Sequence, residues 1–428
     1  MLPPWSVTPA CAGPKGAPGS LRSGRLGATP AALLAATLLG SAAPSPKDPE
    51  PLWRWLDVIA EPTSDWEDLS RARNALLPLL READAAALER ALAALARVLE
   101  DAEAHPSAAE AAAELAGRLG HPAATLPLSR LLTARLPRTD QHAAAQQAAA
   151  RAIGRVGTGA PAITAGLQDA AARSPHPGVR GEALEALVRL APVEVAVPAL
   201  LSALADPVGE VRYLASLGLA RVGPRAASAA PHLRALLDGK ARPHGHFLAW
   251  IEAQYPRDAD DLRCMAGAAA ALLAIGDGAG REALERYLDH PDWLVRQSAL
   301  EALWAAREGA GIGLTATLLA VRLEDPASAL RARALEQLRI LGRPAARAWP
   351  GVTERALQDP DPEVRAAALR AASAMERPDL VVPLLADRLR DPHAAVREEA
   401  DRLLARLARR GDLGALVEAT PPADGPGW

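Results

Sequence analysis

The chain has few aromatic residues and a narrow choice of apolar ones. Aromatic side chains make up 3% of its 428 residues, and phenylalanine occurs once. Valine and isoleucine are too sparse, and alternation of apolar and polar residues is too rare, for a β-sheet. Alanine and leucine supply most of the apolar half of the chain, which indicates helices that pack at close range.

Cysteine and excess charge are also scarce. Cys11 and Cys264 lie far apart in the sequence and suggest no disulfide framework. The formal net charge is −3 at pH 7, so no global field draws the chain to nucleic acid or to an anionic membrane. We therefore expect no nucleic-acid partner and no aligned column of basic residues.

A seven-residue opening returns along the chain and always ends in arginine. The openings begin at residues 174, 206, 257, 290, 325, 359 and 391, which are 32 to 35 residues apart except for one step of 51. The arginines are Arg180, Arg212, Arg263, Arg296, Arg331, Arg365 and Arg397. A fixed period of this size indicates stacked supersecondary units, and the long step marks an insertion.

Each opening leads into a helix with one apolar stripe. If the residue before the arginine is position zero, the stripe continues at positions four, eight and eleven, on one helical face. Position four is alanine in all seven units: Ala183, Ala215, Ala266, Ala299, Ala334, Ala368 and Ala400. We infer that helix backbones approach closely there, where a larger side chain would cost roughly 1–3 kcal/mol.

Many openings start with Asp-Pro. Aspartate is a good helix N-cap, and proline suits the first helical position because no donor is needed there. We therefore expect N-cap aspartates, each followed by a proline at the first helical position, in four units: Asp206, Asp325, Asp359 and Asp391.

The pattern Asp-Pro-x-x-x-Val-Arg-x-x-Ala, followed by a leucine-rich second helix, resembles the HEAT repeat in its short bacterial form. The resemblance is strong over about residues 174–410 and weaker back to about 105. It implies an all-α, right-handed α-solenoid of about nine helix pairs, with the Val-Arg helices on the concave side. It also implies a polar ladder between successive repeats, made of Asp206, Asp325, Asp359 and Asp391 with Arg212, Arg331, Arg365 and Arg397. Ser174, Arg257 and His290 stand in place of the aspartate in the other units.

The remaining segments are assigned around this solenoid. We expect a disordered or targeting tail over residues 1–50, a helical N-terminal cap over 51–104, repeats over 105–410 and a C-terminal tail over 411–428. The three tryptophans of the cap are expected to pack against the first repeat. We predict a cytoplasmic protein; the alternative is export, if residues 21–43 are a signal peptide behind a misplaced start.

The insertion, residues 239–257, differs in composition from the rest of the chain and holds its one phenylalanine. Insertions in repeat proteins map to loops on one face, often the binding face. We predict a partner-binding region here and in the apolar residues on either side: Leu214, Leu217, His244, His246, Phe247, Trp250, Tyr255 and Met265. The alternative is that the insertion patches a joint between repeats and that the apolar residues belong to the core.

No catalytic motif accompanies the repeats. The chain has no Walker loop, no dinucleotide fingerprint and no Gly-x-Ser-x-Gly motif. His244 and His246, with Cys264 and nearby aspartates, match no standard zinc spacing. Among proteins of similar fold, deoxyhypusine hydroxylase needs His-Glu pairs, and no histidine here precedes glutamate. The alkylpurine glycosylases of similar fold use a cationic cleft, whereas the net charge of this chain is negative. Nothing in the sequence points specifically to the bilin lyases.

The sequence therefore predicts a monomeric, non-enzymatic scaffold without cofactor or metal. It would bind another protein or peptide through its concave groove and the 239–257 insertion, and it would not span a membrane. The alternative is a HEAT-like accessory or catalytic protein that acts on a modified protein partner, as a lyase does, or on nucleic acid.

Overall fold

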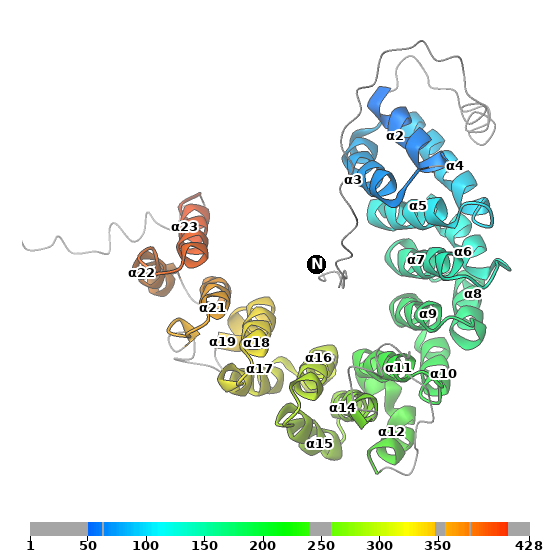
Figure 1. Ribbon diagram of the computed structural model, residues 1–428. Helices are drawn as coiled ribbons and strands as arrows, with labels where there is room; N and C mark the ends of the chain where they lie inside the picture. The colour runs from blue at the N-terminus through cyan, green and yellow to red at the C-terminus, as the bar shows by residue number, and fades with distance from the viewer. Residues whose placement is uncertain (1–49, 62–63, 239–257, 347–355, 376–377, 410–428) are drawn as a thin grey trace, which may run out of the picture.

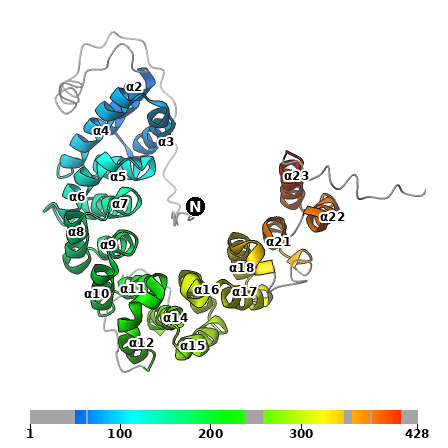
Figure 2. The ribbon, with the colours of Figure 1, turned by 180° about the vertical axis from the view of Figure 1, so that it is seen from behind.

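The structure, a computed structural model, describes residues 50–61, 64–238, 258–346, 356–375 and 378–409. Within these ranges every regular element is a helix. The helices form two rows that curve together into an open arc, with one row on the concave side and the other on the convex side (Figure 1 and, from behind, Figure 2). The predicted all-α solenoid is confirmed.

The two rows alternate along the chain. The inner row consists of α3 (Trp66–Glu82), α5 (Pro106–Leu119), α7 (Asp140–Val156), α9 (Pro177–Leu190), α11 (Gly209–Val222), α14 (Asp258–Ile275), α16 (Trp293–Ala310), α18 (Ser328–Leu341), α21 (Pro362–Met375) and α23 (Ala394–Arg409). The outer row consists of α2 (Glu50–Ala60), α4 (Ala85–Glu100), α6 (Thr125–Thr133), α8 (Pro161–Arg173), α10 (Val193–Ala203), α12 (Ala230–Leu237), α15 (Gly278–Leu288), α17 (Ile312–Val321) and α22 (Pro378–Arg388). The short α19 (Arg343–Ala346) and the 3-10 turns η1 (Pro122–Ala124), η2 (Gly223–Ala229) and η3 (Arg322–Glu324) complete the described elements. None of these helices is both long enough and apolar enough to cross a membrane.

The alanine stripe lies inside the stack of inner helices. All seven position-four alanines have no exposed surface: Ala183, Ala215, Ala266, Ala299, Ala334, Ala368 and Ala400. Each inner helix packs against the inner helices before and after it, so the stripe faces protein on both sides. The apolar area removed from water at each joint holds the arc together.

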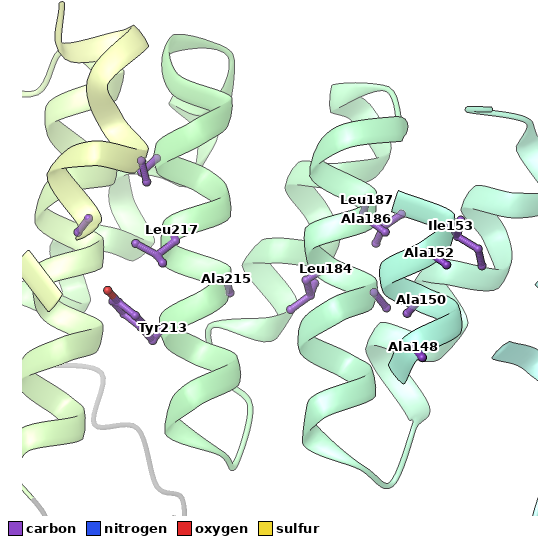
Figure 3. Close-up of a cluster of buried hydrophobic side chains, with 14 of the residues drawn as sticks. Ala148, Ala150, Ala152, Ile153, Leu184, Ala186, Leu187, Tyr213, Ala215 and Leu217 are labelled. Atoms are coloured by element: carbon purple, nitrogen blue, oxygen red, sulfur yellow. The ribbon is translucent and has the colours of Figure 1, made fainter. Parts of the chain in front are cut away.

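Small residues also set how closely the inner helices approach. A Cβ atom added to Gly117 of α5 would lie 2.9 Å from the Cα of Ala152 in α7. One added to Gly154 of α7 would lie 3.2 Å from the Cβ of Ala186 in α9. Figure 3 shows Ala152 and Ala186 in the interface between these helices. In these two interfaces the close approach therefore uses glycine against alanine, further along each helix than position four.

The ladder aspartates precede their helices by three residues. The helix α11 begins at Gly209 and α18 begins at Ser328, so neither Asp206 nor Asp325 is an N-cap, and the prolines after them lie outside the helices. The prediction of Asp-Pro capping is wrong in these units. The aspartate instead accepts from the amide two residues further on, as Asp206 Oδ1 does from Val208 at 2.8 Å, and closes a turn that leads into the helix.

The N-terminal helices α2 to α4 continue the two rows. Trp53 is buried and Trp55 is partly buried against the core, but Trp66, the first residue of α3, is 66% exposed. Two of the three tryptophans are therefore at least partly buried, and the third is exposed.

Candidate interaction surface

Arginine and aspartate side chains link successive units at one edge of the arc. Arg180 donates from Nε and Nη2 to the two carboxylate oxygens of Asp206, at 2.7 and 2.8 Å. The same paired geometry, at 2.7–2.9 Å, joins Arg296 to Asp325, Arg331 to Asp359 and Arg365 to Asp391. No side chain in these four pairs is more than 11% exposed. Bidentate pairs of this kind are strong and fix orientation as well as distance.

Each ladder arginine also holds the loop of its own unit. Arg331 Nη1 donates to the carbonyl oxygens of Asp325 and Pro326, at 2.7 and 3.2 Å. Arg212 and Arg397 make the corresponding bonds to their own loops. The arginine therefore binds both the loop of its own unit and the aspartate of the next unit. Arg180 and Arg296 thus belong to the ladder, although they were not predicted to be part of it.

The electrostatics of the ladder favour ionised carboxylates. The bonds from Arg365 lower the pKa of Asp391, against the opposing effect of burial. Burial raises the pKa of Asp325, but the bonds from Arg296 and from the Ala327 amide outweigh it, and the net pKa is lowered. Both carboxylates are therefore held in the charged form by an arginine of the preceding unit and by a backbone amide of their own loop.

A polar link of a different kind joins the inner helices where the units that begin at Arg257 and His290 lack the ladder aspartate, a place that we call the corner of the arc. Here α11 packs against both α14 and α16. The Tyr213 hydroxyl donates to the carbonyl oxygen of Ser298, at 3.0 Å, and lies 3.3 Å from Glu301. Arg263 lies over the Tyr213 ring, 4.9 Å from its centroid, and donates to Ser298 Oγ at 3.0 Å. Burial, and then the charge of Glu301, raise the pKa of the Tyr213 hydroxyl well above its ordinary value.

The candidate partner-binding residues fall into two groups. Leu217 is only 6% exposed and Leu214 and Met265 are half-buried, so these side chains belong largely to the joint. Figure 3 shows Tyr213 and Leu217 pointing from α11 toward the helices that follow it. Leu217 therefore cannot act as an exposed docking residue. The other five lie outside the described residues: His244, His246, Phe247, Trp250 and Tyr255.

The inner helices carry a second set of charged pairs, more exposed than the ladder. Arg151 of α7 donates from Nε and Nη2 to Glu182 of α9, at 2.9 and 2.7 Å. Similar pairs cross between inner helices along the arc: Arg73–Glu114, Arg221–Glu185, Arg263–Glu210, Arg333–Glu301 and Arg370–Glu399. Partly exposed arginine–glutamate pairs thus connect neighbouring inner helices at six places along the arc.

One basic feature of the inner row was not predicted. The last turn of five successive inner helices carries an arginine, and these five residues form what we call the arginine column: Arg81, Arg118, Arg155, Arg189 and Arg221. The expectation that no basic residues are aligned along the repeats is wrong for this half of the arc. Arg189 and Arg221 occupy position ten, counted as above. Arg118 and Arg155 occupy the same position if Ala108 and Ala145 are taken as position zero of their units.

Metal ligands do not gather in the described part of the chain, where no three histidine, cysteine, aspartate or glutamate side chains lie close enough to hold an ion. Cys264 is buried, and its Sγ lies 3.3 Å from the Gly209 carbonyl oxygen.

The repeat geometry agrees with the comparison against known families. The family model of HEAT repeats matches residues 129–220, 164–243 and 315–405. The chain carries HEAT repeats over these residues. A search of the curated proteins found no relative.

Several solved structures resemble this HEAT-repeat chain at low identity. One is the CpcE–CpcF complex of phycocyanin lyase from Nostoc sp. PCC7120: 20% identity over 73% of this chain and 94% of that one, TM-score 0.38. Human deoxyhypusine hydroxylase is 20% identical over 84% of this chain and 96% of its own, TM-score 0.26. The karyopherin Kap121p bound to the SUMO protease Ulp1p is 14% identical over 84% of this chain and 41% of its own, TM-score 0.38.

Proposed function

We propose that this HEAT-repeat chain is a non-enzymatic scaffold that binds another protein or peptide along its concave side. The observation that carries the proposal is the row of partly exposed charged side chains on successive inner helices. The buried ladder fixes the spacing of these helices, so the charged side chains are presented in a rigid, repeated register. Preorganised charges of both signs favour specific recognition of a partner with a complementary pattern.

The corner of the arc supports the same proposal in a different way. The helices α12 and α14 flank residues 239–257, and α14 packs between α11 and α16. A recognition segment that starts from such a rigid joint would be held at a fixed place on the arc. We retain residues 239–257 as a proposed contact with the partner.

Site-specific photo-crosslinking tests the proposal. A photoreactive residue in place of Arg333, on the concave side of α18, should capture one partner protein in cells of the native host. The matched control replaces Glu282, an exposed residue of the outer helix α15, and should capture none. Capture of the same protein from both positions, or only from the outer one, would contradict the concave side as the binding face. Deletion of residues 239–257 should weaken capture from Arg333 if this segment contributes.

A further inference from the structure

The arginine column lies along a single edge of the arc. Successive inner helices run in the same direction, because an antiparallel outer helix connects each to the next, and so their last turns meet at one edge (Figure 1). Arg81, Arg118, Arg155 and Arg189 are exposed, and Arg221 is partly exposed. The column ends at α14, which has no basic residue in its last turn.

The column holds more positive charge than its surroundings neutralise. Arg81 donates to the Arg118 carbonyl oxygen, and Arg118 donates to the neutral amide of Asn74 at 2.9 Å. Among the described residues, Arg155 has no carboxylate within ion-pair distance. Arg189 and Arg221 share the carboxylate of Glu185, at 3.4 and 3.7 Å. In the described part of the chain, five guanidinium groups thus have one carboxylate within 4 Å.

These like charges act on one another. Burial lowers the pKa of Arg155, and the charges of Arg151, Arg189 and Arg118 lower it further, with Glu182 as the opposing carboxylate. A bound anion would relieve this repulsion. An arginine in the last turn is favoured by the helix dipole, by about 0.3–1 kcal/mol, and this accounts for single residues of the column. The dipole does not account for the shortage of carboxylates beside them.

The outer helices make that shortage clearer. They begin at the edge where the column lies, and the dipole favours acidic residues at helix starts. Yet α4, α6, α8 and α12 have no acidic residue in the first turn, and α10 has only Glu194. Asp84, the N-cap of α4, is bound to the Ala87 amide at 2.7 Å. The edge is therefore kept positive where acidic residues would otherwise be favourable.

We infer that the arginine column is a docking site for an extended acidic segment of a partner protein, a finer claim that rests on the proposed scaffold function. Packed helices lie about 8–10 Å apart. An extended chain advances about 3.3–3.6 Å per residue, so an acidic residue at every third position meets one arginine per helix. The guanidinium group can donate two parallel hydrogen bonds to a carboxylate, so each arginine would fix the orientation of an acidic residue as well as attract its charge.

The neighbouring acidic residues favour a peptide over nucleic acid. Glu114 of α5 and Glu182 and Glu185 of α9 lie closer to the starts of these helices than the column does, and all three are partly exposed. A nucleic acid carries a charge at every phosphate and would meet these glutamates, whereas a peptide can place neutral residues opposite them. The exposed tryptophans of the described residues, Trp66 and Trp293, lie at helix starts, at the other ends of inner helices, and so provide no stacking surface beside the column.

A fluorescence anisotropy titration with synthetic probes tests the inference on the full chain. The probe is an extended peptide with glutamate at every third position, and it is compared with a peptide of the same composition whose glutamates are consecutive and with a single-stranded oligonucleotide. We expect the spaced peptide to bind roughly tenfold tighter than either. Tighter binding of the oligonucleotide, or equal binding of both peptides, would overturn the inference.

A matched pair of variants locates the binding. R118Q/R155Q/R189Q removes three residues of the column and should weaken binding of the spaced peptide roughly tenfold or more. R97Q/R130Q/R173Q removes three last-turn arginines from the outer helices α4, α6 and α8, with the same change in net charge, and should leave binding within about twofold. Equal losses in the two variants would overturn the inference. Because Arg333 lies outside the column, crosslinking from Arg333 would still support the scaffold function in that case.

If the triple variant does not fold, as judged by circular dichroism, R155Q alone is compared with R130Q. A loss confined to R155Q would support the column, and equal affinity of the two would count against it.

Discussion

The hydroxyl of Tyr213 in α11 donates to the carbonyl oxygen of Ser298 in α16, across a distance of 3.0 Å. This bond joins helices that are separated along the inner row by α14. It lies at the corner of the arc, where the units that begin at Arg257 and His290 lack the ladder aspartate. At the corner of the arc, a hydrogen bond therefore joins two units that are not neighbours in the inner row.

Removal of the Tyr213 hydroxyl should weaken this corner. We expect Tyr213→Phe to lower the free energy of unfolding by about 1 kcal/mol, because a buried hydrogen bond is lost while the ring still fills its space. The matched control is Tyr287→Phe, a half-buried tyrosine of α15. Urea unfolding followed by circular dichroism measures both. Equal effects of the two substitutions would show that the bond to Ser298 contributes nothing specific.

In the ladder, the stability contributed by each charged side chain should depend on the presence of its partner. Arg331→Met should destabilise the fold by about 3 kcal/mol, because Asp359 keeps a buried charge without the two donors of the guanidinium group. The double variant Arg331→Met/Asp359→Leu should recover a large part of this loss. Arg281→Met, which breaks an exposed pair with Glu285 in the same helix, should cost less than about 0.5 kcal/mol. A double variant no more stable than the single one would argue against coupling through this pair.

Close helix packing at the corner predicts a cost for one added methyl group. A Cβ on Gly267 would lie 2.0 Å from Ser216 Oγ and 3.0 Å from Ser216 Cβ, and Ser216 is fully buried. We expect Gly267→Ala to destabilise by roughly 1–3 kcal/mol, as overpacking does. Gly313 of α17 has nothing within 4 Å of the added atom, so Gly313→Ala should be neutral or stabilise by up to about 1 kcal/mol. Thermal unfolding of the two variants makes the comparison, and a harmless Gly267→Ala would contradict the packing.

The ladder also predicts sensitivity to acid. The pKa of Asp391 is lowered in the folded chain, so its ionised form adds stability above the unfolded value of about 3.9. That contribution is lost as the pH falls through the lower folded pKa. The difference in unfolding free energy between the native chain and Asp391→Asn should therefore be constant near pH 6 and shrink below about pH 4. A difference that stays the same at pH 3 would exclude this linkage.

The fold could be predicted from the sequence because its signal is repeated. One alanine at position four, in seven units, fixes a helical face and a period without any knowledge of tertiary structure. The capping prediction failed for a related reason: Asp206 matches an N-cap by residue type, but its carboxylate binds Arg180 of the previous unit. A local propensity was overridden by a contact between units.

The residues of the interaction surface were harder to predict from the sequence than the fold. Leu217 belongs to an apolar stretch that has the same composition whether it lies on the surface or in the joint, and only the packing of α11 against α14 and α16 shows that it is buried. The arginine column was present in the sequence at position ten. Its meaning depends on which carboxylates lie near Arg155 and Arg189, and that depends on side chains from neighbouring helices.

The central claim is that two-helix units stack in an open arc whose concave side is free to bind a partner. Small-angle X-ray scattering of the full chain in solution tests it most directly. A compact chain of 428 residues would have a radius of gyration of about 22 Å. The account predicts a clearly larger radius and an asymmetric distribution of interatomic distances. A radius near 22 Å with a symmetric distribution would contradict it.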